Sequence, residues 1–244
     1  MRLLAIALGL SLVGGFGGLA VAATLLLVPA GMRTWLVPTL VSYAVGALLG
    51  VALLELLPQA LVALDARHVF GTLLAGILTF FVLEKLALWR HCHTGDCEVH
   101  RPSTGPLVLI GDAAHNFMDG AVIGAAVLTS VPVAISTAIA VLAHEIPHEV
   151  GDFAILLNAG FTRRKALLFN ATAEAAGLAG AAVSCLALDG MPRAAPYFLA
   201  FAVASFLYVA MSDLIPDLHR ATAEAGAIRQ VLLVTAGVMT VVVF

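Results

Sequence analysis

Two adjacent apolar stretches, residues 106–130 and 132–158, contain many side chains of the kinds that bind metal ions. A charged side chain at the centre of a bilayer costs about 2.5–3.5 kcal/mol on insertion scales, so such residues are rare there and usually functional. Several of them in two neighbouring stretches predict a site for a divalent metal ion. The residues concerned are Asp112, His115, Asn116 and Asp119 in the first stretch, and His144, Glu145, His148, Glu149 and Asp152 in the second.

The spacing of these residues indicates which of them act together. On a helix, residues four apart lie on the same face, and His115 with Asp119 and His144 with His148 are two such pairs. Imidazole nitrogen and carboxylate oxygen bind zinc at about 2.0–2.2 Å. Two pairs on facing helices therefore predict a principal site with four ligands.

A neighbouring stripe of polar residues on the same two helices could supply a second metal position. Asn116 and Glu145 each follow a histidine by one residue, which turns their oxygen atoms toward an adjacent point. The alternative is that all these polar groups only join helices through hydrogen bonds. Arginine and lysine are absent from both stretches, and uncompensated acids with histidines favour a cation over simple hydrogen bonding.

The elements that position these residues must be membrane helices. The chain is 61% hydrophobic and 11% charged, with a mean hydropathy of +1.05, whereas a soluble domain has roughly 25% charged residues. This composition predicts an integral membrane protein whose surroundings are the lipid bilayer. Without a stripe of basic residues, no nucleic-acid partner is expected. The first apolar run continues to Val28, so we favour a retained span over a cleaved signal peptide.

The apolar runs predict an all-α fold with eight transmembrane helices, in a single transmembrane domain over residues 1–244. Turn and charge signals, such as Asp189-Gly190, separate the runs. The short connection at Ser130–Val131 makes the fourth and fifth spans antiparallel neighbours. The expected spans are about 3–28, 37–62, 69–89, 106–129, 132–158, 165–188, 195–217 and 227–244.

Basic residues predict the orientation, because they favour the cytoplasmic side. The loops after the odd-numbered spans and their flanks hold nine basic residues, and the other side holds three. This asymmetry places both termini outside and the 90–105 loop in the cytoplasm. At about 1.5 Å per residue, His115 and His144 then lie roughly 21 and 18 Å from the outer ends of their spans, within one turn of the same level.

At these residues the sequence resembles the ZIP (Zrt/Irt-like) family of metal transporters. The fourth span reads His115-Asn116-Phe117-Met118-Asp119-Gly120, similar to the family's HNFxDG motif. The fifth reads His144-Glu145-Ile146-Pro147-His148-Glu149-Val150-Gly151-Asp152, similar to the HExPHExGD motif of the LIV-1 branch. The order of the motifs and the eight-span layout extend the resemblance over nearly the whole chain.

The resemblance implies a divalent metal transporter, not an enzyme, that moves Zn²⁺ toward the cytoplasm through a ZIP-type bundle. Fe²⁺, Mn²⁺ and Cd²⁺ are further candidate substrates. The expected location is the bacterial cytoplasmic (inner) membrane, and the small-residue stripes are compatible with a homodimer. The implied principal ligands are His115, Asp119, His144 and His148, the adjacent ones are Asn116, Glu145 and Glu174, and the pathway residues are Glu55, Asp112, Glu149 and Asp152.

The loop after the third span carries further candidate ligands. Cysteine and histidine together favour a soft metal such as zinc, and histidine-bearing loops at this place in the family are interpreted as cytoplasmic metal acceptors. The alternative is a polar, solvated loop. The candidate ligands are His91, Cys92, His93, Cys97 and His100.

Two other functions fit parts of the pattern. Residues 144–148 match HExxH, the zinc-protease signature, so an intramembrane metalloprotease is one alternative. Such an enzyme needs a later third ligand and an open metal position, whereas the strongest additional ligands, His115 and Asp119, lie upstream. A metal-binding membrane protein without transport is the other alternative. The ladder of ligands from Glu55 to Asp152 favours passage over a single sensing site.

Overall fold

The computed structural model describes residues 1–91, 104–191, 193–220 and 224–243, and these are helical with short connections. No strand occurs in the described ranges, so the predicted all-α class is confirmed. The elements are α1 (Arg2–Leu25), α2 (Ala30–Gly50), η1 (Val51–Leu56), α3 (Leu57–Ala63), α4 (Ala66–His91), α5 (Thr104–Thr129), α6 (Val131–Asn158), α7 (Arg163–Asp189), α8 (Ala195–Tyr208), η2 (Val209–Leu214), α9 (Ile215–Arg220) and α10 (Glu224–Val243).

Helices occupy all eight predicted spans. Within the described residues, seven segments are long and apolar enough to cross a membrane: α1, α2 through α3, α4, α6, α7, α8 through η2, and α10. The remaining segment, α5, is long enough at 26 residues, but Asp112, His115, Asn116 and Asp119 interrupt its apolar sequence. The membrane character of the fold is confirmed, while the count of eight spans stays a prediction.

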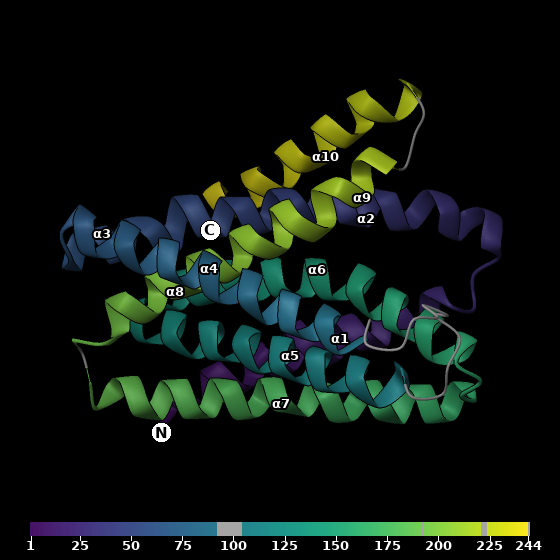
Figure 1. The fold of residues 1–244 in the computed structure, drawn as a ribbon. Helices are drawn as coiled ribbons and strands as arrows, with labels where there is room; N and C mark the ends of the chain where they lie inside the picture. Colours follow the sequence, from purple (N-terminus) through teal and green to yellow (C-terminus); the bar gives the residue numbers. More distant parts are fainter. Residues whose placement is uncertain (92–103, 192, 221–223, 244) are drawn as a thin grey trace.

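The helices form two packed groups (Figure 1). In the first group α5 packs along α7, and α1 lies against α6, α7 and α5. In the second group α2 packs against α10, and α4 against α8. Contacts of α2 with α6 join the groups. Successive long helices run in alternating directions, and both termini lie toward the same end of the bundle (Figure 1). The first group therefore contains every helix that carries a residue of the predicted principal and adjacent sites.

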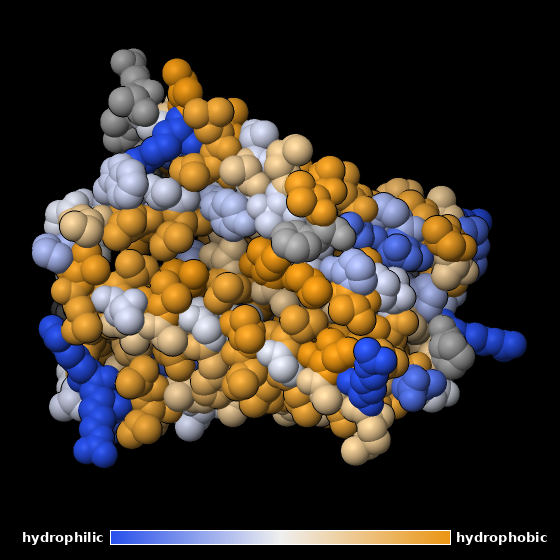
Figure 2. Space-filling view, turned by 180° about the vertical axis from the view of Figure 1, so that it is seen from behind, coloured by the Kyte–Doolittle hydropathy of each residue, from blue (hydrophilic) through white to orange (hydrophobic). Residues whose placement is uncertain are grey.

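The surface has the distribution expected of a bilayer-embedded molecule. Figure 2 shows hydrophobic residues across the middle of one face, with the strongly hydrophilic residues toward its ends. Large apolar side chains such as Phe70, Leu74, Leu78 and Phe81 on α4 are about half exposed. In water such a surface would promote aggregation, whereas lipid tails can cover it.

Two helices contain a π-helical turn, η1 and η2, at corresponding places. The sequence from Val51 to Pro58 reads VALLELLP, and that from Val209 to Pro216 reads VAMSDLIP. Each turn carries one acid and is followed by a proline, which lacks the amide hydrogen needed to continue a regular helix. Similar local sequences thus produce the same irregularity twice, and π turns often occur at functional places.

Local signals fix the connections that bracket α6. Ser130 caps its start, where Oγ accepts a hydrogen bond from the amide of Val133 at 3.3 Å. At its end Gly160 has a φ of +87°, a conformation that favours glycine. The amide of Phe161 then donates to the carbonyl of Leu156 at 3.1 Å. Both ends of the central ligand helix are therefore determined by residues next to it in sequence.

Candidate metal centre

Four potential ligands from α5 and α6 converge between the helices. Nε2 of His144 lies 2.8 Å from Oδ2 of Asp119 and 3.2 Å from Nε2 of His115. Oε1 of Glu145 lies 3.4 Å from Nε2 of each histidine. His115 Nε2 and Asp119 Oδ2 lie 3.7 Å apart, so all four residues are in reach of one another. The prediction that His115 and His144 lie at the same level is confirmed by their contact.

These separations are close to those of a tetrahedral zinc site. Ligands at about 2.0–2.2 Å from a tetrahedral ion lie about 3.3–3.6 Å from one another. The five separations in this cluster run from 2.8 to 3.7 Å. The four ligand atoms could therefore surround one ion with small side-chain movements. We call His115, Asp119, His144 and Glu145 the four-ligand cluster.

The backbone of α6 orients the His144 ring. Its Nδ1 lies 3.0 Å from the carbonyl oxygen of Ala140, one turn earlier. A carbonyl oxygen can only accept, so Nδ1 carries a proton, and Nε2 is the nitrogen left to face the other ligands. Metal-binding histidines are commonly held in this way through the nitrogen that does not bind the metal. His144 is thus prepared to bind a cation through the atom that faces Asp119.

Burial makes the cluster electrostatically incomplete without a cation. Asp119, His144 and Glu145 are at most 2% exposed. Within the described residues, the carboxylate oxygens of Asp119 and of Glu145 have no hydrogen-bond partner apart from the imidazole nitrogens of the cluster itself. Buried polar groups without partners are rare in folded proteins and call for an explanation, such as an ion. A divalent cation would satisfy these oxygens and balance the two negative charges.

His148 lies outside this cluster, whereas the sequence placed it among the principal ligands. Its Nδ1 faces Asp112 Oδ1 at 3.8 Å and Asp152 Oδ2 at 3.7 Å. Glu145 takes the fourth position instead. The spacing of four residues puts His144 and His148 on one face, about 6 Å apart along the axis, and the His148 ring faces Asp112 and Asp152 instead of the cluster. The two rings therefore serve different levels of the bundle.

The predicted adjacent position is also arranged differently. Glu145 and Glu174 meet as expected, but their third neighbour is Glu149 on α6. Asn116 points toward Asp112 and donates a hydrogen bond from Nδ2 to its Oδ1 at 3.0 Å. All three glutamates are buried.

Sequence reasoning missed Asn170 on α7. This residue is fully buried, and its Nδ2 donates to Glu149 Oε2 at 2.7 Å. Its place four residues before Glu174, on the same face of the helix, was the available signal. Asn170 Oδ1 has no hydrogen-bond partner within the described chain, so it adds an oxygen donor beside the three glutamates.

Two predicted groups lie away from these clusters. Glu55 is on η1, partly exposed, and belongs to none of the ligand groups in the described chain. The loop candidates Cys92, His93, Cys97 and His100 lie outside the described residues, as does the side chain of His91. The structure therefore leaves the predicted loop site as a prediction.

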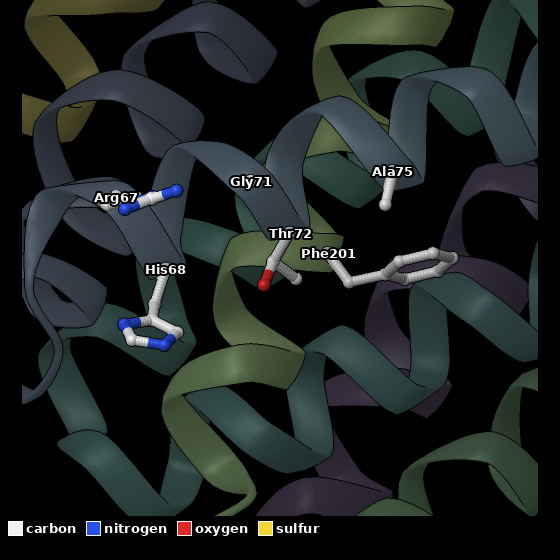
Figure 3. A pocket seen from close by; sticks show the side chains of 6 residues that line it. All are labelled: Arg67, His68, Gly71, Thr72, Ala75 and Phe201. Atoms are coloured by element: carbon white, nitrogen blue, oxygen red, sulfur yellow. The ribbon is translucent and has the colours of Figure 1, made fainter.

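A pocket of about 500 Å³ lies elsewhere, between α4 and α8. Figure 3 shows Arg67, His68 and Thr72 of α4 and Phe201 of α8 around it. None of the described residues that line it carries a carboxylate. This pocket is thus not part of the candidate metal centre.

Helix α1 holds the ligand helices from the other side through close contacts at glycine. A Cβ atom at Gly18 would lie 2.7 Å from Cβ of Glu145 and 3.5 Å from its carbonyl carbon. Gly15 is likewise in contact range of the Glu174 carboxylate. Small residues allow membrane helices to approach this closely. The glycines of α1 therefore set how far the carboxylates of α6 and α7 can extend.

Comparisons with known proteins agree with this geometry. Residues 91–244 match the family model described as ZIP Zinc transporter. Zinc transporter ZIP13 of Pongo abelii is 35% identical over 250 residues, covering 93% of this chain and 75% of that protein. ZIP13 of Mus musculus is 31% identical over 277 residues, covering 92% and 76%. Zinc transporter ZIP4 of Homo sapiens is 44% identical over 110 residues, covering 45% and 17%. The chain therefore belongs to the ZIP family of zinc transporters.

Proposed function

We propose that this protein transports Zn²⁺ across the membrane toward the cytoplasm, through the four-ligand cluster. The observation that carries the proposal is the convergence of two imidazoles and two carboxylates from α5 and α6 at tetrahedral spacing. The relatives that match over most of the chain are named zinc transporters. The direction toward the cytoplasm is what the family resemblance implies, and the nine-to-three distribution of basic residues supports only the orientation of the chain in the membrane.

The charge of the cluster suits the cargo. Asp119 and Glu145 supply two negative charges, which balance one Zn²⁺ ion. A bare divalent ion is strongly disfavoured in a low-dielectric interior. A neutral complex removes most of that penalty, while two imidazoles replace part of the ion's water shell. The cluster can therefore hold zinc at a depth in the membrane where water is not present to solvate the ion.

The helix arrangement suggests how access could alternate. α5 and α6, which carry the cluster, pack with α1 and α7 in one group. Movement of this group relative to α2, α4, α8 and α10 would expose the cluster first to one side and then to the other. This movement agrees with the sliding of helix bundles that the family resemblance implies.

Finer properties of the transporter stay predictions. Mixed nitrogen and oxygen sites also accept Fe²⁺, Mn²⁺ and Cd²⁺, and competition with zinc uptake would rank them. The bacterial inner membrane and the homodimer rest on sequence alone, and the relatives named above come from animals.

A metalloprotease is disfavoured by the same geometry. In an HExxH protease Glu145 would act as the general base and His148 would bind the metal. Here Glu145 lies among the ligands, and His148 lies in another group. Four protein ligands would also fill a tetrahedral ion and leave no position for a catalytic water. Cleavage of a membrane peptide by the purified protein would favour the protease instead.

Uptake of ⁶⁵Zn²⁺ into proteoliposomes tests the proposal. The wild type should show saturable uptake, and His144→Ala and the isosteric Asp119→Asn should each lower it by more than about tenfold. His68→Ala is the matched control, because His68 is an exposed histidine outside the cluster. Circular dichroism and gel filtration would verify that each variant is folded.

Two results would contradict the proposal. Uptake by His144→Ala at the wild-type rate would remove the cluster from the pathway. Absence of uptake by a folded wild type that binds zinc tightly would favour a metal-binding protein that does not transport.

A further inference from the structure

The pocket between α4 and α8 lies on the surface of the bundle, away from the metal ligands, and we call it the α4–α8 groove. Its volume of about 500 Å³ falls in the range of about 300–1,000 Å³ that is typical of sites for small molecules. Figure 3 shows Arg67 and His68 at one end of the groove, and Ala75 with Phe201 at the other. One end of the groove is therefore polar and the other apolar.

Small residues on α4 create the apolar part of the groove. Gly71 and Ala75 are four residues apart, so they lie on one face of the helix. Both are exposed, and a Cβ atom at Gly71 would meet nothing within 4 Å. The neighbouring stripe of the helix carries Phe70 and Leu74, which are bulky and about half exposed. The small residues thus leave a furrow along α4, beside the ring of Phe201, on a surface that faces lipid.

The polar end of the groove has a positive charge without a partner. Within the described chain, Arg67 makes no ion pair with a carboxylate and no contact with an aromatic ring, whereas Arg229 lies over Trp35. The nearby acid, Asp65, is directed to His68: its Oδ1 accepts a hydrogen bond from the amide at 3.1 Å, and its Oδ2 contacts the ring. The guanidinium of Arg67 is therefore left to bind an anion.

The middle of the groove has an unused hydrogen-bond donor. Thr72 lies one turn beyond His68, and its hydroxyl makes no hydrogen bond to any of the described residues. Thr79 on the same helix shows the usual arrangement, in which the hydroxyl donates to the carbonyl of Ala75 at 2.8 Å. A hydroxyl without a partner is unfavourable in apolar surroundings. A bound group with an acceptor oxygen would stabilise Thr72.

The order of these groups matches that of the parts of a glycerophospholipid. Arg67 lies at the start of the apolar segment Ala66–Leu83, where lipid headgroups are found. At about 1.5 Å per residue, Thr72 and Ala75 lie about 7.5 and 12 Å deeper along α4. A guanidinium binds two phosphate oxygens at once. The Thr72 hydroxyl can then donate to an ester carbonyl, and an acyl chain can lie in the furrow against Phe201.

We propose that the α4–α8 groove binds one anionic glycerophospholipid, with its phosphate on Arg67 and an acyl chain in the furrow. This site depends on the membrane character of the protein and not on its transport function. An anionic headgroup fits best, because a zwitterionic lipid carries its own ammonium group, which competes with Arg67 for the phosphate. Since α4 and α8 both line the groove, the bound lipid holds these two helices of the second group together.

Native mass spectrometry of the full-length protein, delipidated in a nonionic detergent, tests the site by counting bound lipids. The probe is dioleoylphosphatidylglycerol, and the wild type should bind one copy at least about tenfold more tightly than any further copy. Dioleoylphosphatidylcholine should bind more weakly. Arg67→Ala should lower the affinity for the first copy about tenfold or more, because hydrogen bonds to a charged group are lost. Arg67→Lys keeps the charge without the paired geometry and should lose less.

Two further variants separate the charge from the furrow. Gly71→Leu leaves Arg67 in place, fills the furrow and meets no neighbouring atom at its Cβ, so it should fold. It should lower the affinity about tenfold or more, the equivalent of about two buried methylene groups. Gly9→Leu is its matched control, since Gly9 on α1 is also exposed with open surroundings. Arg164→Ala, which removes an exposed arginine at the start of α7, is the control for Arg67→Ala. Circular dichroism verifies that each variant is folded.

Several results would overturn the lipid site. Absence of a distinct first lipid on the wild type would do so, as would unchanged affinity in either folded variant, Arg67→Ala or Gly71→Leu. Equal affinity for phosphatidylcholine would reject the preference for an anionic headgroup. Displacement of the lipid by glycerol 1-phosphate would indicate a site for the phosphate group alone. A wild-type dimer that binds no lipid, and that Gly71→Leu converts to a monomer, would assign the groove to a second copy of this chain.

Discussion

Replacing Gly18 by alanine tests whether α1 fixes the position of Glu145. A Cβ at Gly18 would lie 2.7 Å from Glu145 Cβ, and side-chain carbons essentially never approach below 3.0 Å. An ordinary contact needs about 3.4 Å, so the two helices must separate by about 0.3–0.7 Å. The contact involves the root of the glutamate side chain, so the side chain cannot simply rotate away.

The size of this displacement sets the expected effect. Metal ligands must lie within about 0.2 Å of their proper distances, so a shift of Glu145 by more than that should weaken zinc binding about tenfold. Overpacking of a filled interior costs about 1–3 kcal/mol. Alanine favours a helix over glycine by roughly 1 kcal/mol, and this gain partly offsets the loss of stability.

A second glycine on the same helix separates the two contributions. Gly9 is exposed, and an added Cβ would meet nothing within 4 Å. Gly9→Ala therefore carries the helix-propensity gain alone. The difference in unfolding free energy between Gly18→Ala and Gly9→Ala should be about 1–3 kcal/mol.

Thermal unfolding in detergent and ⁶⁵Zn²⁺ binding measure the two effects. Gly18→Ala should unfold at a lower temperature than Gly9→Ala and bind zinc at the four-ligand cluster more weakly. Equal melting temperatures and equal affinities for the two variants would refute the argument that α1 sets the position of the ligand.

Three further predictions concern stability. Ser184 on α7 donates a buried hydrogen bond to the Ala121 carbonyl of α5 at 2.7 Å. Ser184→Ala should therefore lower the unfolding free energy by about 0.6–1.7 kcal/mol, and by more than the control Ser136→Ala, whose hydroxyl bonds within its own helix. The hydrogen bond from His68 lowers the pKa of Asp65, outside the membrane spans. This hydrogen bond stabilises the folded protein fully above the unfolded pKa of Asp65, about 3.9, and the stabilisation is lost as pH falls through the lower folded pKa. The melting temperature of the wild type should therefore fall more steeply with acid pH than that of Asp65→Asn. Zinc at about 100 times its dissociation constant should stabilise the wild type by about 2.7 kcal/mol, and EDTA should reverse that shift in the melting temperature.

The sequence contained most of the fold because membrane insertion depends on local composition. An apolar run long enough to cross the bilayer becomes a helix, since its backbone groups find no other hydrogen-bond partners in lipid. Each of the eight predicted spans accordingly overlaps a helix. The π turns η1 and η2 could not be predicted in the same way, because apolar periodicity does not distinguish them from regular helix.

The sequence by itself determined which residues could bind a metal and on which two helices they lie. Spacing of three and four residues fixes the face of a helix, and the short link at Ser130 makes α5 and α6 neighbours. Only the tertiary structure decided how the ligands are divided, because that depends on the relative rotation and height of separate helices. The rotation and height of α5 and α6 place Glu145 beside His115 and His144, and place His148 beside Asp112 and Asp152.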